Sequence, residues 1–167
     1  MRALYLTSVW LHILAATLWI GGMGVLVLVV VPWLKRGDRA RAATLIRETG
    51  ERFRPVGWGC FAVVLVTGTY NLWFRGVRLG DFARASFLAS PFGISVVAKL
   101  AVFAVVIALS AVHDFSIGPS ATREMSRDPD GPKALALRKR ASIMGRANAL
   151  LALLLLAIAV TIVRGWP

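Results

Sequence analysis

Four long apolar runs decide what this chain can fold into. They cover residues 7–34, 55–73, 92–112 and 143–163. Each is long enough, at roughly 20 residues with few charges, to cross a hydrocarbon layer of ~30 Å as an α-helix. The alternating segments typical of a membrane β-barrel are absent from the sequence. We therefore predict an all-α integral membrane protein, a four-transmembrane-helix up-down bundle that forms one transmembrane domain over residues 1–167.

The charge balance gives the expected partner. Apolar residues make up 57% of the chain and charged residues 17%, which excludes a disordered chain. The net charge of +12 would suggest nucleic acid in a soluble domain, but here the charges lie between the apolar runs. We expect a lipid bilayer as the partner and no nucleic acid. The single cysteine, Cys60, excludes an internal disulfide and a cysteine-based zinc site.

The basic residues also predict the orientation. They crowd the first and third connections and are sparse in the second, which has Arg75, Arg78 and Arg84. The crowded connections contain Lys35, Arg36, Arg39, Arg41, Arg47, Arg52 and Arg54, and then Arg123, Arg127, Lys133, Arg138, Lys139, Arg140 and Arg146. Because basic loops stay in the cytoplasm, we expect a bacterial-type inner (plasma) membrane protein with both termini and the 75–91 loop outside the cytoplasm.

Three connecting segments carry local predictions. The first basic connection mixes Ala42, Ala43, Leu45 and Ile46 with its charges, which is typical of a short interfacial helix. A second short helix is expected over residues 81–88. Residues 116–132 are rich in Ser, Asp, Gly and Pro and are predicted to form an irregular loop.

Two ionisable residues lie inside the apolar runs, where their insertion costs about 2.5–3.5 kcal/mol or more. His12 lies about five residues inside the first run, and Lys99 a similar distance inside the third. These two runs point in the same direction in an up-down bundle, so both groups are expected at a similar depth near the outer face. We predict a site there, with His12 as the metal or cofactor ligand and Lys99 as the catalytic residue.

Neighbouring residues extend this predicted site. Trp19 continues the His12 stripe, and Gly22 beside it permits either close helix packing or a flat ligand. At about the depth of His12 and Lys99, the second run ends with the polar residues Thr67, Thr69, Tyr70 and Asn71. We therefore expect cofactor contacts from Trp19, Gly22, Tyr70 and Asn71.

A second candidate site lies toward the inner face. His113 ends the third run, and Asn148 lies near the beginning of the fourth. His12 and His113 are separated by roughly 20 Å along the helices, at 1.5 Å per residue, so they cannot bind one ion or one haem together.

The residues of these runs resemble a known family. His12, Trp19, Gly21-Gly22, Lys99-Leu100, Arg146 and Asn148 look like the copper-resistance D (CopD-type) membrane domain and the related HemJ-type protoporphyrinogen oxidases. The HemJ-type resemblance implies haem b binding and functional roles for His12 and Lys99. Ala149-Leu150 replaces the acidic residue expected after the asparagine of that type, which weighs against porphyrinogen oxidation.

Three functions remain open from the sequence. The first is a haem b binding redox protein, a membrane oxidoreductase if it is an enzyme, in which the protein sets axial ligation and access. The second is a copper transport or copper homeostasis protein, although the spans offer only the isolated soft ligands Met23, Cys60 and Met144. The third is a non-catalytic subunit of a larger membrane complex, and a homo-oligomer is a further expectation.

Overall fold

The computed structural model describes residues 1–30, 32, 39–128 and 130–165. All regular elements in this described part are helical, as predicted. Four helices are long and apolar enough to cross a membrane, which confirms the all-α, four-span prediction. The internal contacts divide the chain into two compact units, Met1–Ile94 and Ser95–Pro167.

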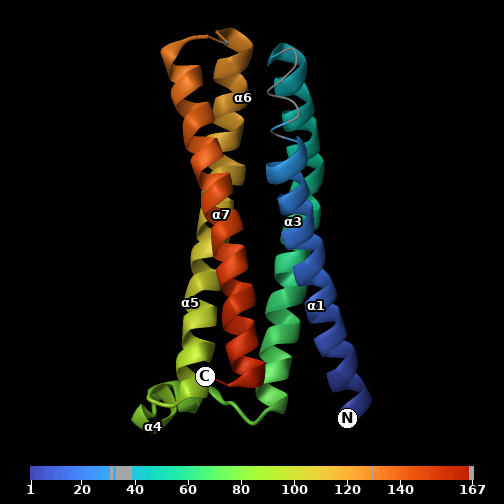
Figure 1. Ribbon diagram of the computed structural model, residues 1–167, viewed down its shortest axis with the longest axis vertical. Helices are drawn as coiled ribbons and strands as arrows, with labels where there is room; N and C mark the ends of the chain where they lie inside the picture. Colours follow the sequence, from blue (N-terminus) through green and yellow to red (C-terminus); the bar gives the residue numbers. More distant parts are fainter. Residues whose placement is uncertain (31, 33–38, 129, 166–167) are drawn as a thin grey trace. The chain divides into compact units, whose positions relative to one another are not determined.

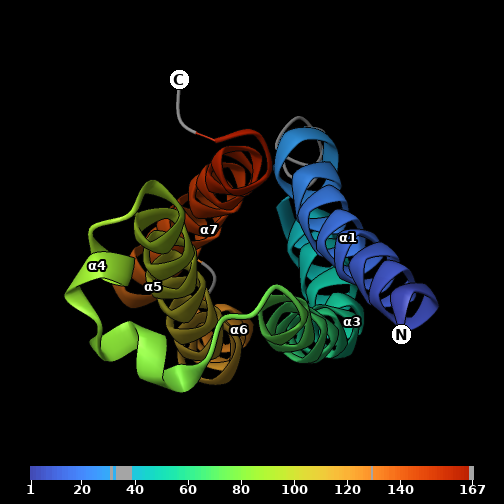
Figure 2. The same cartoon turned by 90° about the horizontal axis from the view of Figure 1, so that it is seen from below.

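The first unit is built on an antiparallel helical pair. Helix α1 (Arg2–Val25) continues into the π-helical turn η1 (Leu26–Val30), and α3 (Arg39–Phe74) returns along it. Figures 1 and 2 both show α1 lying along α3. The 3₁₀ turn η2 (Leu79–Ala83) and the single-turn helix α4 (Ala85–Leu88) follow, and the first turn of the next helix closes the unit.

Contacts between α1 and α3 recur about every seven residues, close to two helical turns. They join Tyr5 to Phe74 (ring centroids 4.2 Å apart), His12 to Thr67 (2.9 Å between Nδ1 and Oγ1) and Trp19 to Phe61 (ring centroids 4.9 Å apart). This spacing keeps one stripe of α1 against one stripe of α3. This register places His12 between the Tyr5 and Trp19 contacts, on the stripe of α1 that faces α3.

The first basic connection differs from the prediction. A separate interfacial helix around residues 42–46 is wrong, because α3 begins at Arg39 and runs without a break through Pro55. A proline inside a helix removes one hydrogen bond and clashes with a carbonyl, at about 3 kcal/mol. Packing against α1 on both sides of Pro55 offsets this cost: Phe53 lies beside Gly22, and Gly57 lies beside Trp19. The basic cluster at 35–38 lies outside the described residues.

The second unit contains the other two long helices. Helix α5 (Pro91–Val112) is followed by the π-helical turn η3 (His113–Ile117), α6 (Gly118–Arg127) and α7 (Pro132–Arg164). Hydrogen bonds join α7 to α5 near both ends of α5. Ser95 Oγ lies 3.1 Å from Thr161 Oγ1, and Asn148 Nδ2 donates to Ser110 Oγ at 2.7 Å.

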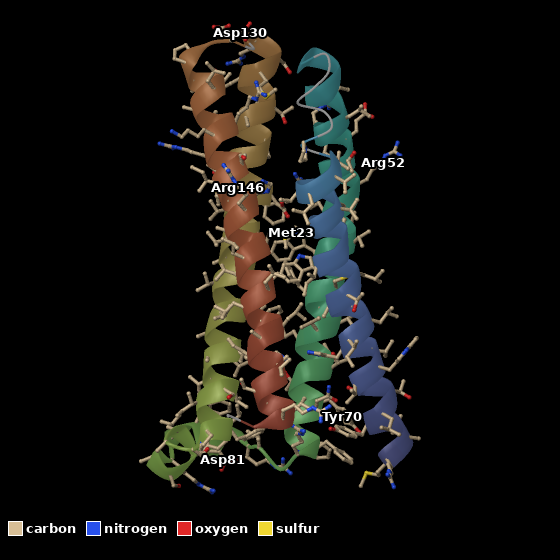
Figure 3. All side chains as sticks on the ribbon, in the orientation of Figure 1. Met23, Arg52, Tyr70, Asp81, Asp130 and Arg146 are labelled. Atoms are coloured by element: carbon tan, nitrogen blue, oxygen red, sulfur yellow. The ribbon has the colours of Figure 1, made fainter. Side chains whose placement is uncertain are left out.

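The irregular loop predicted over residues 116–132 is wrong, because most of it forms α6, which lies beside α7 (Figure 1). Pro119 lies in the first turn of α6, directly after the π-helical turn η3, and the helix continues through it. The buried alanines Ala121 and Ala134 are small enough for close helix packing. Lys133 Nζ donates to Glu124 Oε1 at 2.8 Å across the turn that contains Asp130, which Figure 3 labels.

The predicted short helix at 81–88 is confirmed only in part: the segment forms two short pieces, η2 and α4, separated by the extended backbone of Arg84. Along the four long helices most large apolar side chains are exposed, Leu18 and Leu150 among them. A bilayer satisfies such surfaces, and the helices keep their backbone hydrogen bonds internal. The chain is therefore a multi-pass membrane protein.

Candidate functional site

His12 is held by a threonine of the opposite helix. Its Nδ1 lies 2.9 Å from Oγ1 of Thr67, and the Thr67 hydroxyl donates to the Val63 carbonyl at 2.6 Å. A hydroxyl has a single proton, so Thr67 must accept a hydrogen bond from His12. The proton of the neutral imidazole is therefore on Nδ1, and the lone pair is on Nε2. This is the arrangement in which a histidine binds a metal or accepts a proton through Nε2.

The surroundings of His12 fix the position of the ring. A Cβ at Gly68 would lie 3.1 Å from the imidazole Cε1, so the glycine lets the ring approach the backbone of α3. One turn before His12, Ser8 donates to the Thr67 carbonyl at 3.4 Å. Ser8 and Thr67 are both buried. The imidazole is thus oriented by α3 and does not rotate freely between the helices.

Asn71 and Tyr70 lie about one turn beyond Thr67, toward the end of α3 where Figure 3 labels Tyr70. Asn71 shares the helix face of Thr67, and its Oδ1 is a buried acceptor without a hydrogen-bond partner among the described residues. The Tyr70 ring lies 6.0 Å from that of Trp73 and belongs to an aromatic group at the helix end. Both lie near the predicted site, and their cofactor contacts remain predictions.

Trp19 and Gly22 pack the helix pair about two and three turns beyond His12 along α1. Trp19 is buried against Phe61. A Cβ at Gly22 would come within 2.9 Å of the Phe53 ring Cζ, so glycine is needed for the close approach of α1 and α3. The Phe53 ring fills the space that a flat ligand beside Gly22 would use. The contact with Phe53 explains Gly22 by close helix packing, and its cofactor contact remains a prediction.

Lys99 belongs to the second unit and is half-buried on α5. It shares a helix face with Val106 and Ser110, which are buried. His12 belongs to the first unit. The predicted common depth of His12 and Lys99, and the catalytic role of Lys99, remain predictions.

The residues of the second candidate site have different surroundings. Asn148 is buried and donates to Ser110, but its Oδ1 has no hydrogen-bond partner in the described part of the chain. His113 begins the π-helical turn, where its Nδ1 lies 3.0 Å from Oδ1 of Asp114. The Asn148–Ser110 bond is sufficient to explain the asparagine as a helix-packing contact. A ligand role for either residue is untested.

Sequence reasoning missed two residues of the His12 site, Ser8 and Gly68. A signal for Ser8 was present, since it precedes His12 by one turn and shares its face. Gly68 had no signal, because the need for a glycine there depends on the packing of α1 against α3. Within residues 1–30, 32, 39–128 and 130–165, no three His, Cys, Asp or Glu side chains gather to hold a metal ion.

Comparison with known proteins points to copper. Residues 47–162 match the family described as copper resistance protein D, so the match begins after α1 and does not include His12. An uncharacterised protein of Aquifex aeolicus (strain VF5) is 31% identical over 167 residues, which is 99% of this chain and 98% of that protein. The copper transport protein CutJ of Bacillus subtilis (strain 168) is 30% identical over 104 residues, 62% of this chain but 18% of that protein. No solved structure matches the chain.

Proposed function

We propose, from the premise that the chain belongs to the copper resistance protein D family, that it transports copper or maintains copper homeostasis in the membrane, with His12 as a copper ligand. The observation that carries the residue assignment is the hydrogen bond from His12 Nδ1 to Thr67 Oγ1. The similarity to a copper transport protein, which extends over 18% of that protein, supports copper as the transported ion.

The chemistry of His12 suits a cargo ion. Imidazole nitrogen is a good copper ligand, and a hydrogen bond on the second ring nitrogen orients the ligand and raises its basicity. In the described part of the chain His12 is not part of a cluster of three or more His, Cys, Asp or Glu side chains. A site with few ligands binds weakly, and a transported ion must leave its site as readily as it enters. The single histidine therefore fits passage of copper better than storage.

Haem b, the first function considered from the sequence, has no support in these comparisons, which refer to copper. We therefore assign no redox reaction to the protein. Membership of a larger complex and homo-oligomerisation remain predictions.

The function can be tested on the purified full chain. Proteoliposomes are loaded with copper on one side, and metal flux is compared with that of empty liposomes, while metal content and the visible spectrum are measured on the same preparation. The proposal expects copper flux above that of empty liposomes, and no Soret band. A Soret band that survives washing, with neither copper binding nor flux, would overturn it.

Replacing Thr67 by valine tests the hydrogen bond that orients His12. Valine keeps the shape and removes the acceptor, and loss of such a partner typically lowers metal affinity 10–100-fold. We expect copper affinity to fall by about tenfold, as measured by competition with a copper chelator. Thr67→Ser, which keeps the hydroxyl, should retain most of the affinity. Equal behaviour of the valine and serine variants would contradict the assignment of Thr67.

The orientation is a separate prediction. With the basic connections in the cytoplasm, reporter fusions within residues 118–127 should report the cytoplasmic side, and fusions at the C-terminus and within 79–83 the opposite side. Alkaline phosphatase and fluorescent-protein fusions give opposite signals at each position. The reverse pattern would move the His12 end of α1 to the cytoplasmic face and refute the charge argument.

A further inference from the structure

The connection between α3 and α5 folds into a shallow recess that the copper site does not use. Its volume is about 370 Å³, and its wall includes Arg75, Asp81, Arg84, Phe87 and Phe92. We call these five residues the loop recess. All of them belong to the first unit, and Asp81 is labelled in this connection in Figure 3.

The loop recess presents guanidinium groups whose donors are only partly used. Arg84 Nη1 lies 2.9 Å from Oδ1 of Asp81, and the other carboxylate oxygen accepts the Arg78 backbone N–H at 2.7 Å. Both oxygens of Asp81 are therefore occupied, whereas the Arg84 side chain is 70% exposed and has further N–H donors. The Arg75 guanidinium carbon lies 5.8 Å from the centre of the Phe92 ring, a contact that uses its charge and needs no N–H donor.

Aromatic rings form the apolar wall beside these charges. The rings of Phe82 and Phe87 pack edge to face at 5.5 Å, and those of Phe87 and Phe92 at 6.3 Å. The three rings form one connected cluster, and aromatic side chains have few rotatable bonds to order when a ligand binds. The recess therefore combines cationic donors with a rigid apolar surface.

The position of the recess in the chain fixes its depth in the membrane. It lies between the last residue of α3, Phe74, and the first of α5, Pro91, where two membrane-spanning helices end and begin. That is the level of the lipid headgroups. A ligand found at this level carries a phosphate ester next to glycerol and acyl carbons, which matches guanidinium donors next to phenyl rings.

We propose that the loop recess binds the phosphate of an anionic phospholipid headgroup, with Arg75 and Arg84 as its donors. Arginine suits this role because its planar donors match two phosphate oxygens at once. Free inorganic phosphate offers the same chemistry, so the test must separate the two sources. The cationic wall also argues against this recess as a copper entrance, since like charges repel.

Lipid retention by the full chain in detergent tests this proposal. Native mass spectrometry follows binding of phosphatidylglycerol and of phosphatidylcholine, with inorganic phosphate as a competitor at constant ionic strength. We expect tighter binding of phosphatidylglycerol, little displacement by phosphate, and about tenfold weaker binding in the Arg75→Gln/Arg84→Gln double variant. Arg164→Gln removes an exposed charge outside the recess and is the matched control, for which unchanged binding is expected.

A variant that is expected to bind lipid more tightly gives a second test, because misfolding could weaken lipid binding but would not strengthen it. Asp81→Asn keeps an oxygen acceptor for the Arg78 N–H but frees Arg84 from its ion pair, so phosphatidylglycerol should bind about threefold or more tightly. Displacement by inorganic phosphate would show free phosphate as the ligand and overturn the lipid assignment. Unchanged lipid binding in both the double variant and Asp81→Asn would overturn the site itself.

Discussion

Alanine in place of His12 is expected to lower copper affinity and copper flux by at least about 100-fold. Loss of a residue that only orients a ligand costs 10–100-fold, and loss of the ligand itself should cost at least as much. His12 supplies the Nε2 lone pair of the site, and Thr67 is a poor replacement, because copper(I) prefers softer donors than a neutral hydroxyl oxygen. Chelator competition and copper flux in proteoliposomes measure the loss.

Two further variants separate a ligand role from helix packing. Ile13→Ala changes the adjacent, exposed side chain of α1 and should leave copper handling unchanged. His12→Met removes the hydrogen bond to Thr67 but supplies a thioether, which copper(I) accepts readily. We expect it to recover part of the copper affinity that alanine loses. If methionine behaves like alanine while both proteins fold normally, His12 acts through packing and the ligand assignment fails.

The four-span fold could be predicted because each span carries its own signal. An apolar run of membrane length needs no long-range information, and the structure confirms four such helices. The predictions failed where the local residue composition favours one structure and packing against another helix stabilises a different one. Pro55 indicates a helix boundary by propensity, yet α3 runs through it because Phe53 and Gly57 pack against α1 on either side. Ser, Asp and Pro around residue 120 indicate a loop, yet α6 forms against α7.

The candidate site was predictable only in part for the same reason. An ionisable residue in an apolar run can be identified from the sequence alone, and His12 was found in this way. Its partner depends on the register of two helices far apart in sequence, so Thr67 could be placed at the right depth but not paired with His12. Gly22 shows the opposite difficulty: small residues make room, and only the opposing helix shows that Phe53 fills that room.

Substitution of Gly93 by alanine is expected to destabilise the protein by about 3 kcal/mol, near the upper end of the range for overpacking. Gly93 is buried in the first turn of α5, and a Cβ there would overlap the Phe87 carbonyl oxygen and lie 2.8 Å from its carbon. That carbonyl cannot move away cheaply, because it accepts hydrogen bonds from both the backbone N–H and the hydroxyl of Ser90, at 3.0 Å and 2.7 Å. The Ser90 hydroxyl oxygen in turn accepts the Gly93 N–H at 3.0 Å.

The sign of the effect makes this substitution informative. Helix propensity alone predicts that Gly→Ala stabilises a helix interior by up to about 1 kcal/mol, whereas the close approach to Phe87 predicts the opposite. Thermal unfolding in detergent should show a lowered melting temperature, by about 5–10 °C for a chain of this size. Gly80→Ala, in the same connection but with open space around the added carbon, should change the melting temperature by less than about 2 °C.

Because Phe87 also lines the loop recess, Gly93→Ala should weaken phosphatidylglycerol retention as well, while Gly80→Ala should not. A Gly93→Ala protein as stable as the parent would mean that the turn between α4 and α5 does not hold Phe87 against the helix, and the rigid wall assigned to the recess would then be lost.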